Sequence, residues 1–290
     1  MKVTIYSPHN SRSDYIVYQY NSIRRHLKDE YEYIVINDAV LTPDYTNLMN
    51  PNAREDIRTV CKELGIPCVE FPPELHEHRR SLFPNSYTEH SENYSQKTAN
   101  VFQFAVNHSA DKEGIVMLMD GDMFFCKDVS LTQHLEGVNL SYLDQHRQNI
   151  HYMWNGIVWY KPQEIPNVRE MNFDTGRIPG NPLDAGGMTH EYLQKYKDRL
   201  SIRHVVSIME AFPSKKIPDI FDYPSCLQAN AFLQDVCQST TLDKERFPDW
   251  QTLDGFICHY REGGNWNKRS YQDHLIKTRT FLDAFADSLF

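Results

Sequence analysis

The feature that most constrains this chain is an unbroken apolar run followed at once by two aspartates. Residues 115–119 are all apolar, and Asp120, Gly121 and Asp122 follow directly. A run of this length predicts a strand buried on both faces, as in a parallel sheet. The two carboxylates then lie at its carboxyl end, the edge where open α/β sheets bind ligands. Gly121 lets the backbone turn sharply and lets a bound group come close.

Two hard oxygen ligands at such an edge suit Mg²⁺ or Mn²⁺, which commonly bridge a protein carboxylate and a substrate phosphate. An Asp-x-Asp pair is also common in surface turns, so the motif alone is consistent with both interpretations. Other parts of the chain are needed to distinguish a turn from a metal site.

The overall composition is that of a globular protein. The 290 residues are 40% hydrophobic and 24% charged, which permits one large α/β domain. The net charge of -9 argues against broad nucleic-acid binding. No run is long enough to span a membrane, and residues 1–7 read as a strand and not as a signal peptide. The six cysteines stand singly in apolar contexts. We therefore expect free thiols and a cytoplasmic location, the host cytoplasm if the source is viral.

The first part of the chain alternates between predicted strands and helices. Strands are expected at residues 2–6, 33–36 and 67–71. The first helix would be capped by Ser13 or Asp14, and the second would run from about Asn52 to Gly65. This order predicts a parallel sheet. Residues 72–92 are polar and form a predicted long loop, in which His76-Glu77-His78 is expected to be solvated because no third ligand follows at useful spacing.

The later part adds strands that end in, or are interrupted by, polar residues. A helix is expected at about residues 93–108, before the aspartate strand, and further strands at 138–143, 152–160 and 256–260. The first of these three ends at Asp144, the second is interrupted by Asn155-Gly156, and the third contains His259. A C-terminal helix follows, whose apolar stripe fits either core packing or a dimer seam. No linker or repeat divides the chain, which predicts one domain over residues 1–290.

Asp120-Gly121-Asp122 resembles the Asp-x-Asp motif of the GT-A glycosyltransferases, which transfer a sugar from a nucleotide diphosphate. The late segment His259-Tyr260-x-x-Gly263-Gly264-Asn265-Trp266-x-Lys268 is similar to the His-x-x-Gly-x-x-Lys-type motif of glycogenin-like members. In those members the histidine completes the metal site, and the following glycines and lysine face the diphosphate. The spacing after His259 departs from theirs, so a retaining mechanism does not carry over.

Three further motifs look similar to a group of little-characterised bacterial and viral glycosyltransferases. They are Ser95-x-Lys97-x-x-Asn100, Trp154-Asn155-Gly156 and Asp184-x-Gly186-Gly187. The resemblance implies a GT-A-like, Rossmann-type mixed sheet flanked by helices, in a single domain with two fused lobes. Residues from about 1 to 125 would form the nucleotide-sugar-binding lobe. Residues from about 126 to 290 would form the acceptor lobe and the late metal and diphosphate motif.

The resemblance also implies ligands. Asp120, Asp122 and His259 would hold Mn²⁺ (or Mg²⁺), the donor would be a UDP- or GDP-sugar, and the acceptor a glycan or another hydroxyl compound. A divalent ion stabilises the charge that develops on the leaving diphosphate, and Mn²⁺ tolerates mixed carboxylate and imidazole ligands. The expected donor- and acceptor-binding residues are Ser7, Pro8, Asp38, Ser95, Lys97, Asn100, Asp120, Gly121, Asn155, Gly156, Gly186, Gly263, Gly264, Trp266 and Lys268.

A carboxylate is needed as general base if the reaction inverts the anomeric centre. Asp184 is the first candidate and Asp144 the second. If configuration is retained, Asp184 would orient sugar hydroxyls instead. Structural roles compete with these assignments: His259 could be a hydrogen-bonded core histidine, Asp184 a helix cap and Lys97 a solvated charge.

Two other functions fit the same fold. A sugar-phosphate nucleotidyltransferase usually opens with a glycine-rich basic loop, and residues 7–13 contain no glycine. A non-catalytic nucleotide-sugar or glycan-binding protein would keep the fold without turnover, but the intact Asp120, Asp122 and His259 argue against it. We therefore predict an enzyme, a hexosyl- or pentosyltransferase.

Overall fold

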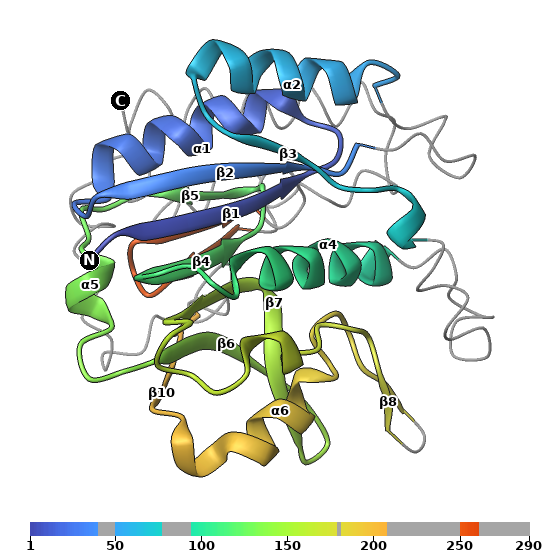
Figure 1. Ribbon diagram of the computed structural model, residues 1–290, viewed down its shortest axis with the longest axis vertical. Coiled ribbons are helices and arrows are strands. Elements are labelled where there is room, and N and C mark those ends of the chain that lie inside the picture. Colours follow the sequence, from blue (N-terminus) through green and yellow to red (C-terminus); the bar gives the residue numbers. More distant parts are fainter. Residues whose placement is uncertain (40–49, 77–93, 179–180, 208–249, 261–290) are drawn as a thin grey trace, which may run out of the picture.

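The apolar runs of the sequence form the strands of a seven-stranded sheet (Figure 1). The structure is a computed structural model that describes residues 1–39, 50–76, 94–178, 181–207 and 250–260. The strands of the sheet are β1 (Val3–His9), β2 (Tyr31–Asn37), β3 (Cys68–Glu70), β4 (Ile115–Met119), β6 (Leu140–Arg147), β7 (Ile150–Tyr160) and β10 (Ile202–His204). Their order in space is β10-β6-β7-β4-β1-β2-β3. The five residues of β4 are all buried, as the sequence predicts.

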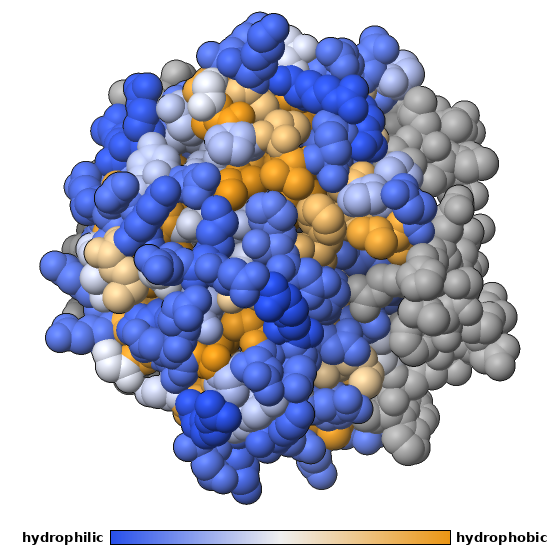
Figure 2. All heavy atoms as spheres, in the orientation of Figure 1, coloured by the Kyte–Doolittle hydropathy of each residue, from blue (hydrophilic) through white to orange (hydrophobic). Residues whose placement is uncertain are grey.

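Helices cover both faces of this sheet. They are α1 (Ser13–His26), α2 (Ala53–Leu64), α4 (Tyr94–Ser109), the short α5 (Leu131–His134) and α6 (Thr189–Tyr196), with 3₁₀ turns η2 (Val168–Glu170) and η3 (Lys197–Arg199). Ile16 of α1 and Ile57 of α2 join one buried cluster, whereas Phe102 of α4 and Tyr192 of α6 join the other. In Figure 1, α1 and α2 accordingly lie on one side of the sheet, and α4 and α6 on the other. Figure 2 shows a largely hydrophilic outer face on which hydrophobic residues form small, separated groups.

The sheet is mixed. β1 pairs in parallel with β2 and β4, and β2 pairs in parallel with β3, whereas β7 runs antiparallel to both β4 and β6. This confirms the predicted fold class, an α/β protein with a Rossmann-type mixed sheet flanked by helices. The carboxyl ends of β1, β2 and β4 meet at one edge, and the middle of β7 passes the same edge.

A second, three-stranded sheet brings a late part of the chain to this edge. β5 (Met123–Phe125), β11 (Trp250–Leu253) and β12 (Ile257–Tyr260) lie in the order β11-β12-β5. In this antiparallel pairing His259 stands opposite Met123, next to the two aspartates. A small hairpin of β8 (Arg177–Ile178) and β9 (Asn181–Pro182) completes the described strands.

Several local predictions need correction. α1 begins after Arg12 with no side-chain cap, so the predicted capping by Ser13 or Asp14 is wrong; Asp14 instead accepts a hydrogen bond from Arg12 Nε at 2.8 Å. The strand predicted to end before Asp144 continues through it, with an irregularity between Tyr142 and Asp144, and forms a hairpin with β7. α2 does end at Gly65, which adopts a left-handed conformation with φ of 67°.

Some expected features fall outside the described residues. These are the C-terminal helix, the late glycines and lysine, and most of the polar loop after Pro72. The division into two lobes stays a prediction. Among the described helices, none is long and apolar enough to cross a membrane.

Candidate functional site

Asp120, Asp122 and His259 come together in space. One potential ligand atom from each lies within 4.8 Å of the others, and His259 Nε2 lies 3.4 Å from Asp122 Oδ1. Asp120 directly follows β4, Asp122 directly precedes β5, and His259 comes from β12. The pairing of β12 with β5 is therefore what delivers the histidine to the aspartates. The three side chains form a mixed carboxylate and imidazole set of the kind that holds a divalent transition ion.

The turn that carries the aspartates is held tightly. The Asp120 backbone N–H donates to Gly156 O at 2.9 Å, and the Met123 N–H donates to Asp120 O at 3.2 Å. A Cβ added to Gly121 would lie 2.7 Å from Pro8 O and 2.9 Å from the His9 ring. No side chain fits there without displacing backbone, so glycine is required by close packing against the end of β1.

A buried glutamine on α1 anchors the same turn from below. Gln19 Nε2 donates to the carbonyl oxygens of Asp120 at 2.9 Å and Met123 at 2.8 Å. Its Oε1 accepts from the Tyr33 hydroxyl and lies 3.3 Å from His9 Nε2. Gln19 is fully buried. These bonds hold the carbonyls on both sides of Asp122 and so fix the backbone of the turn that carries it.

The carboxylates of the cluster stand close together, so a nearby positive charge would stabilise their ionised forms. Burial raises the pKa of Asp120 well above its usual range, and the neighbouring charges of Asp122 and Asp184 raise it further. Burial also lowers the pKa of His9 to about 4, against the opposing effect of its hydrogen bond with Gln19. His9 is therefore neutral at physiological pH and contributes no cation. A divalent ion between the carboxylates would supply the missing charge.

A pocket of about 160 Å³ opens beside the cluster. It includes five of the predicted site residues, Pro8, Asp38, Asp120, Gly121 and Asp122. The other lining residues, which the sequence-based prediction missed, are His9, Asn10, Ser11, Arg12, Tyr15, Thr98 and Val101. The pocket thus lies between the ends of β1 and β2 and the early turns of α4. This is the edge at which a Rossmann-type sheet is expected to bind its ligand.

Arg12 gives this pocket a cation. Its side chain is 4% exposed, and its guanidinium lies 4.7 Å above the centre of the Tyr15 ring. It is also paired with Asp14. Stacking and pairing hold the planar group in one orientation, in which Nε and one terminal nitrogen already donate to the Asp14 carboxylate. The available sequence signal was a single arginine in the loop after the first strand.

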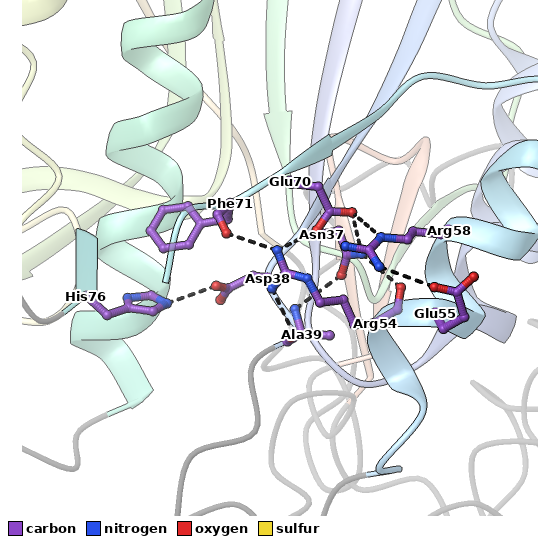
Figure 3. A network of polar contacts seen from close by, with 9 residues as sticks. All are labelled: Asn37, Asp38, Ala39, Arg54, Glu55, Arg58, Glu70, Phe71 and His76. Atoms are coloured by element: carbon purple, nitrogen blue, oxygen red, sulfur yellow. Dashed lines mark hydrogen bonds and ion pairs between the residues drawn. The ribbon is translucent and has the colours of Figure 1, made fainter. Parts of the chain in front are cut away.

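On the far wall of the pocket, a chain of hydrogen bonds links α4 to Asp38, the residue directly after β2. Asn100 Nδ2 donates to His76 Nδ1 at 3.1 Å. His76 Nε2 in turn donates to Asp38 Oδ1 at 2.9 Å (Figure 3). The His76 side chain is only 13% exposed, so the prediction that it is solvated is wrong. Burial raises the pKa of Asp38, and the hydrogen bond from His76 and the charge of Lys97 oppose this. Asn100, a predicted ligand-binding residue, acts here as a support for His76.

Figure 3 also shows how the end of β2 is tied to α2 and β3. Arg54 donates to Ala39 O at 3.2 Å and to Phe71 O at 3.3 Å, and it pairs with Glu70. Asn37 Nδ2 donates to Glu70 Oε1 at 3.1 Å. Arg54 thus satisfies the carbonyl of Ala39, directly after Asp38, and that of Phe71, directly after β3, and it ties the segment that carries Asp38 to its neighbours.

The opposite side of the cluster is formed by β7 and the loop before α6. The Trp154 ring covers Gly156, where an added Cβ would lie 2.3 Å from the indole, and the ring centre lies 5.3 Å from that of His259. Gly186 has φ of 88°, and an added Cβ would lie 2.0 Å from Met153 O. The loop containing Asp184 is therefore packed directly on β7, and its charge reaches Asp120. Asn155 is 5% exposed within the same stretch.

The remaining predicted residues are dispersed. Ser7 is fully buried and hydrogen-bonds the His9 ring at 3.2 Å, beneath the pocket. Ser95 and Lys97 lie half-buried in the first turns of α4. Asp144 bonds to His151 at 2.7 Å on the β6–β7 hairpin. Gly263, Gly264, Trp266 and Lys268 lie outside the described residues.

No protein-family model matches the chain, and no curated protein matches it. Among solved structures it is similar to the mannosyltransferase PcManGT from Pyrobaculum calidifontis, in complex with GDP-Man and Mn²⁺. The sequence identity is 12% and the TM-score 0.40, over 70% of this chain and 54% of that one. The chain thus spans about half the length of that protein. Overlap at this level identifies neither an activity nor a ligand for this chain.

Proposed function

We propose that this protein is a metal-dependent glycosyltransferase that moves a sugar from a UDP- or GDP-sugar to a glycan or other hydroxyl acceptor. The observation that supports this most is the convergence of Asp120, Asp122 and His259 beside a pocket at the ligand-binding edge of the sheet. The Asp-x-Asp resemblance assigns the same two aspartates to a metal that bridges to a diphosphate.

The metal would be Mn²⁺ (or Mg²⁺), held by Asp120, Asp122 and His259. When bound, such an ion stabilises the negative charge that develops on a leaving diphosphate. The residues fit it, because burial and the neighbouring charge of Asp122 raise the pKa of Asp120, and the His259 imidazole lies 3.4 Å from Asp122. The mixed donor set favours Mn²⁺ over Mg²⁺.

The donor would enter between the ends of β1 and β2. Pro8 and Asp38 line this part of the pocket, and Asp38 is oriented by His76 to accept hydrogen bonds from a base or ribose. Arg12 would contact an anionic part of the donor. By resemblance, Gly263, Gly264, Trp266 and Lys268 would approach the diphosphate.

The acceptor would bind on the side of Asn155, Gly156 and Gly186. Asp184 remains the first candidate for the general base, since its charge acts on Asp120 and its loop is packed on β7. Asp144 is the weaker candidate because its carboxylate is bonded to His151. In a retaining reaction Asp184 would orient sugar hydroxyls instead of accepting a proton.

The test is a thermal-shift panel of UDP, GDP, ADP, CDP and dTDP, each with and without Mn²⁺. We expect UDP or GDP to raise the melting temperature only when Mn²⁺ is present, and Asp122→Asn to abolish the rise. Asp111→Asn is the matched control, because Asp111 is an exposed carboxylate paired with Arg169 far from the pocket.

Release of free nucleotide from the matching nucleotide sugar would then separate an enzyme from a binding protein. We expect slow Mn²⁺-dependent release by the wild-type chain and none by Asp122→Asn. If no nucleotide diphosphate raises the melting temperature with Mn²⁺ present, the proposed function is wrong.

A further inference from the structure

A second group of metal-type side chains lies on the β6–β7 hairpin, apart from the pocket. The cross-strand register places His146 opposite His151 and Asp144 opposite Met153. Directly opposed residues of an antiparallel pair project from the same face, and residues two apart on one strand do so as well. Asp144, His146 and His151 therefore share one face of the hairpin.

The three side chains already stand close to one another. One potential ligand atom from each lies within 4.8 Å of the other two. His151 Nδ1 lies 2.7 Å from Asp144 Oδ2, and the two imidazole rings are stacked with their centres 5.5 Å apart. Zinc ligands lie about 2 Å from the ion and so roughly 3–4 Å from one another. Since both histidines are exposed, small rotations of their side chains reach this geometry without a change in the backbone.

Only one of the two carboxylate oxygens of Asp144 has a hydrogen-bond partner among the described residues. Its Oδ2 has His151 as a partner, whereas its Oδ1 is buried and has no hydrogen-bond partner among the described residues. A buried carboxylate oxygen without a partner is costly, and a cation at the carboxylate offsets that cost. This second observation points to a positive ligand at the same place as the paired histidines.

We propose that Asp144, His146 and His151 bind a divalent transition-metal ion, with Zn²⁺ as the representative ion. Two imidazoles and one carboxylate suit Zn²⁺, Ni²⁺ or Cu²⁺, whereas Mg²⁺ and Ca²⁺ prefer oxygen ligands. Water completes the coordination, because the histidines face solvent. The ion clamps the two strands together at the outer end of the hairpin.

The position of this clamp connects it to the acceptor side of the pocket. Met153, opposite Asp144 on β7, carries the carbonyl against which Gly186 is packed. Metal binding at the hairpin stiffens the strand that supports the loop of Asp184. The site shares no ligand with the Asp120, Asp122 and His259 cluster, and only Asp144, the weaker candidate for the general base, also has a place in the proposed glycosyltransferase function.

The experiment is a Zn²⁺ titration of the full chain in competition with a chromogenic zinc chelator. Other side chains bind Zn²⁺ as well, so the result is read as a difference between variants. We expect His146→Ala and His151→Ala each to lose one equivalent of bound Zn²⁺, or to weaken that equivalent by at least about tenfold. His204→Ala, which removes an exposed histidine of β10, should lose nothing.

Asp122→Asn separates the two clusters. That variant should keep the Zn²⁺ equivalent that depends on His146 and His151, whatever it does to Mn²⁺ binding. Unchanged far-ultraviolet circular dichroism and melting temperature without metal confirm that the histidine variants fold. If folded His146→Ala and His151→Ala chains bind as much Zn²⁺ as the wild type with the same affinity, the proposal is overturned.

Discussion

The Asp120, Asp122 and His259 cluster and the Asp144, His146 and His151 cluster use the same chemical groups in opposite settings. The first is mostly enclosed, with the His259 side chain 5% exposed, and takes its members from three separate strands or strand ends. The second lies within a single hairpin, and its His151 side chain is 62% exposed. One is assembled by the tertiary fold and the other by strand register alone.

The difference shows what each arrangement requires of the rest of the molecule. The enclosed cluster depends on Gln19, Gly121 and the pairing of β12 with β5, because two neighbouring carboxylates repel each other and stay close together only if the backbone holds them. The hairpin cluster needs less support from distant residues, because one turn joins its two strands and both of its histidines are exposed. Damage to distant supporting residues should therefore affect the first cluster and spare the second.

Gly121→Ala should have the largest effect. The added methyl group meets Pro8 O and the His9 ring at less than 3 Å, so the turn must move. We expect a loss of about 1–3 kcal/mol in the free energy of unfolding, and Mn²⁺ binding at the enclosed cluster should disappear. Urea unfolding and electron paramagnetic resonance of free Mn²⁺ measure the two effects.

Gly65→Ala is the control for this change. An added Cβ at Gly65 meets nothing within 4 Å, although its positive φ costs about 1 kcal/mol. Mn²⁺ affinity should be unchanged there. If Gly121→Ala binds Mn²⁺ as the wild type does, close packing at the turn is not what organises the cluster.

His259→Asn should come next in size. The change removes a direct ligand, so we expect Mn²⁺ affinity to fall by at least about 100-fold, the upper end of what loss of a mere supporting contact costs. His146→Asn should leave Mn²⁺ affinity unaltered. Equal losses in the two variants, measured by the same resonance titration, would abolish the distinction between the clusters.

Gln19→Met tests the support from below the turn. The two side chains have similar volume, but methionine leaves the Asp120 and Met123 carbonyls without their donor. We expect Mn²⁺ affinity to fall about tenfold, and stability by about 1–3 kcal/mol. Gln163→Met, at an exposed glutamine that donates to Lys112 O, should change neither quantity. Zn²⁺ binding at the hairpin should persist in both variants.

Glu70→Gln should have the smallest effect, because solvent screens the ion pairs that this partly exposed carboxylate makes with Arg54 and Arg58. Burial raises the Glu70 pKa, but the hydrogen bond from Arg58 and the charge of Arg54 outweigh it, and the pKa is lowered. The stabilisation is present above the unfolded-state pKa and is lost as the pH falls through the folded-state value. The side chain is 36% exposed, so solvent screening limits the cost to roughly 0.5–1 kcal/mol at pH 7.

Urea unfolding at pH 7 and at pH 4 checks this last prediction. The difference between Glu70→Gln and the wild type should shrink at the lower pH, and metal binding at both clusters should be unaffected. A difference that grows as the pH falls would contradict the assigned pKa direction.

Much of the fold follows from the sequence because buried parallel strands are unbroken apolar runs. The run before Asp120 fixes both the strand and the place where the carboxylates emerge. The alternation of strands and helices up to Glu70 predicts the parallel pairs. His259 could be linked to the aspartates only by resemblance to a family motif, since nothing in its local pattern shows that β12 pairs with β5.

The missed residues are those whose role depends on tertiary contacts. Gln19 lies on the buried stripe of α1 between Ile16 and Ile23, so a polar residue at a core position was a signal that could have been used. His76 looked solvated because its partners, Asp38 and Asn100, lie on other elements. Likewise, the length of β6 was underestimated because the strand beyond Leu143 leaves the core and consists of polar residues alone, with no apolar alternation to mark it as a strand.

Because the enclosed cluster needs β12 and the hairpin cluster does not, the two clusters can form at different times during synthesis of the chain. The hairpin ligands are complete once β7 has formed, and a hairpin closes within about 1–10 μs. The enclosed cluster must wait until the ribosome has added almost half the chain beyond Asp122, because His259 is made so much later. A nascent chain that ends before β12 therefore carries the two aspartates without His259, and the enclosed cluster is incomplete until β12 has been made.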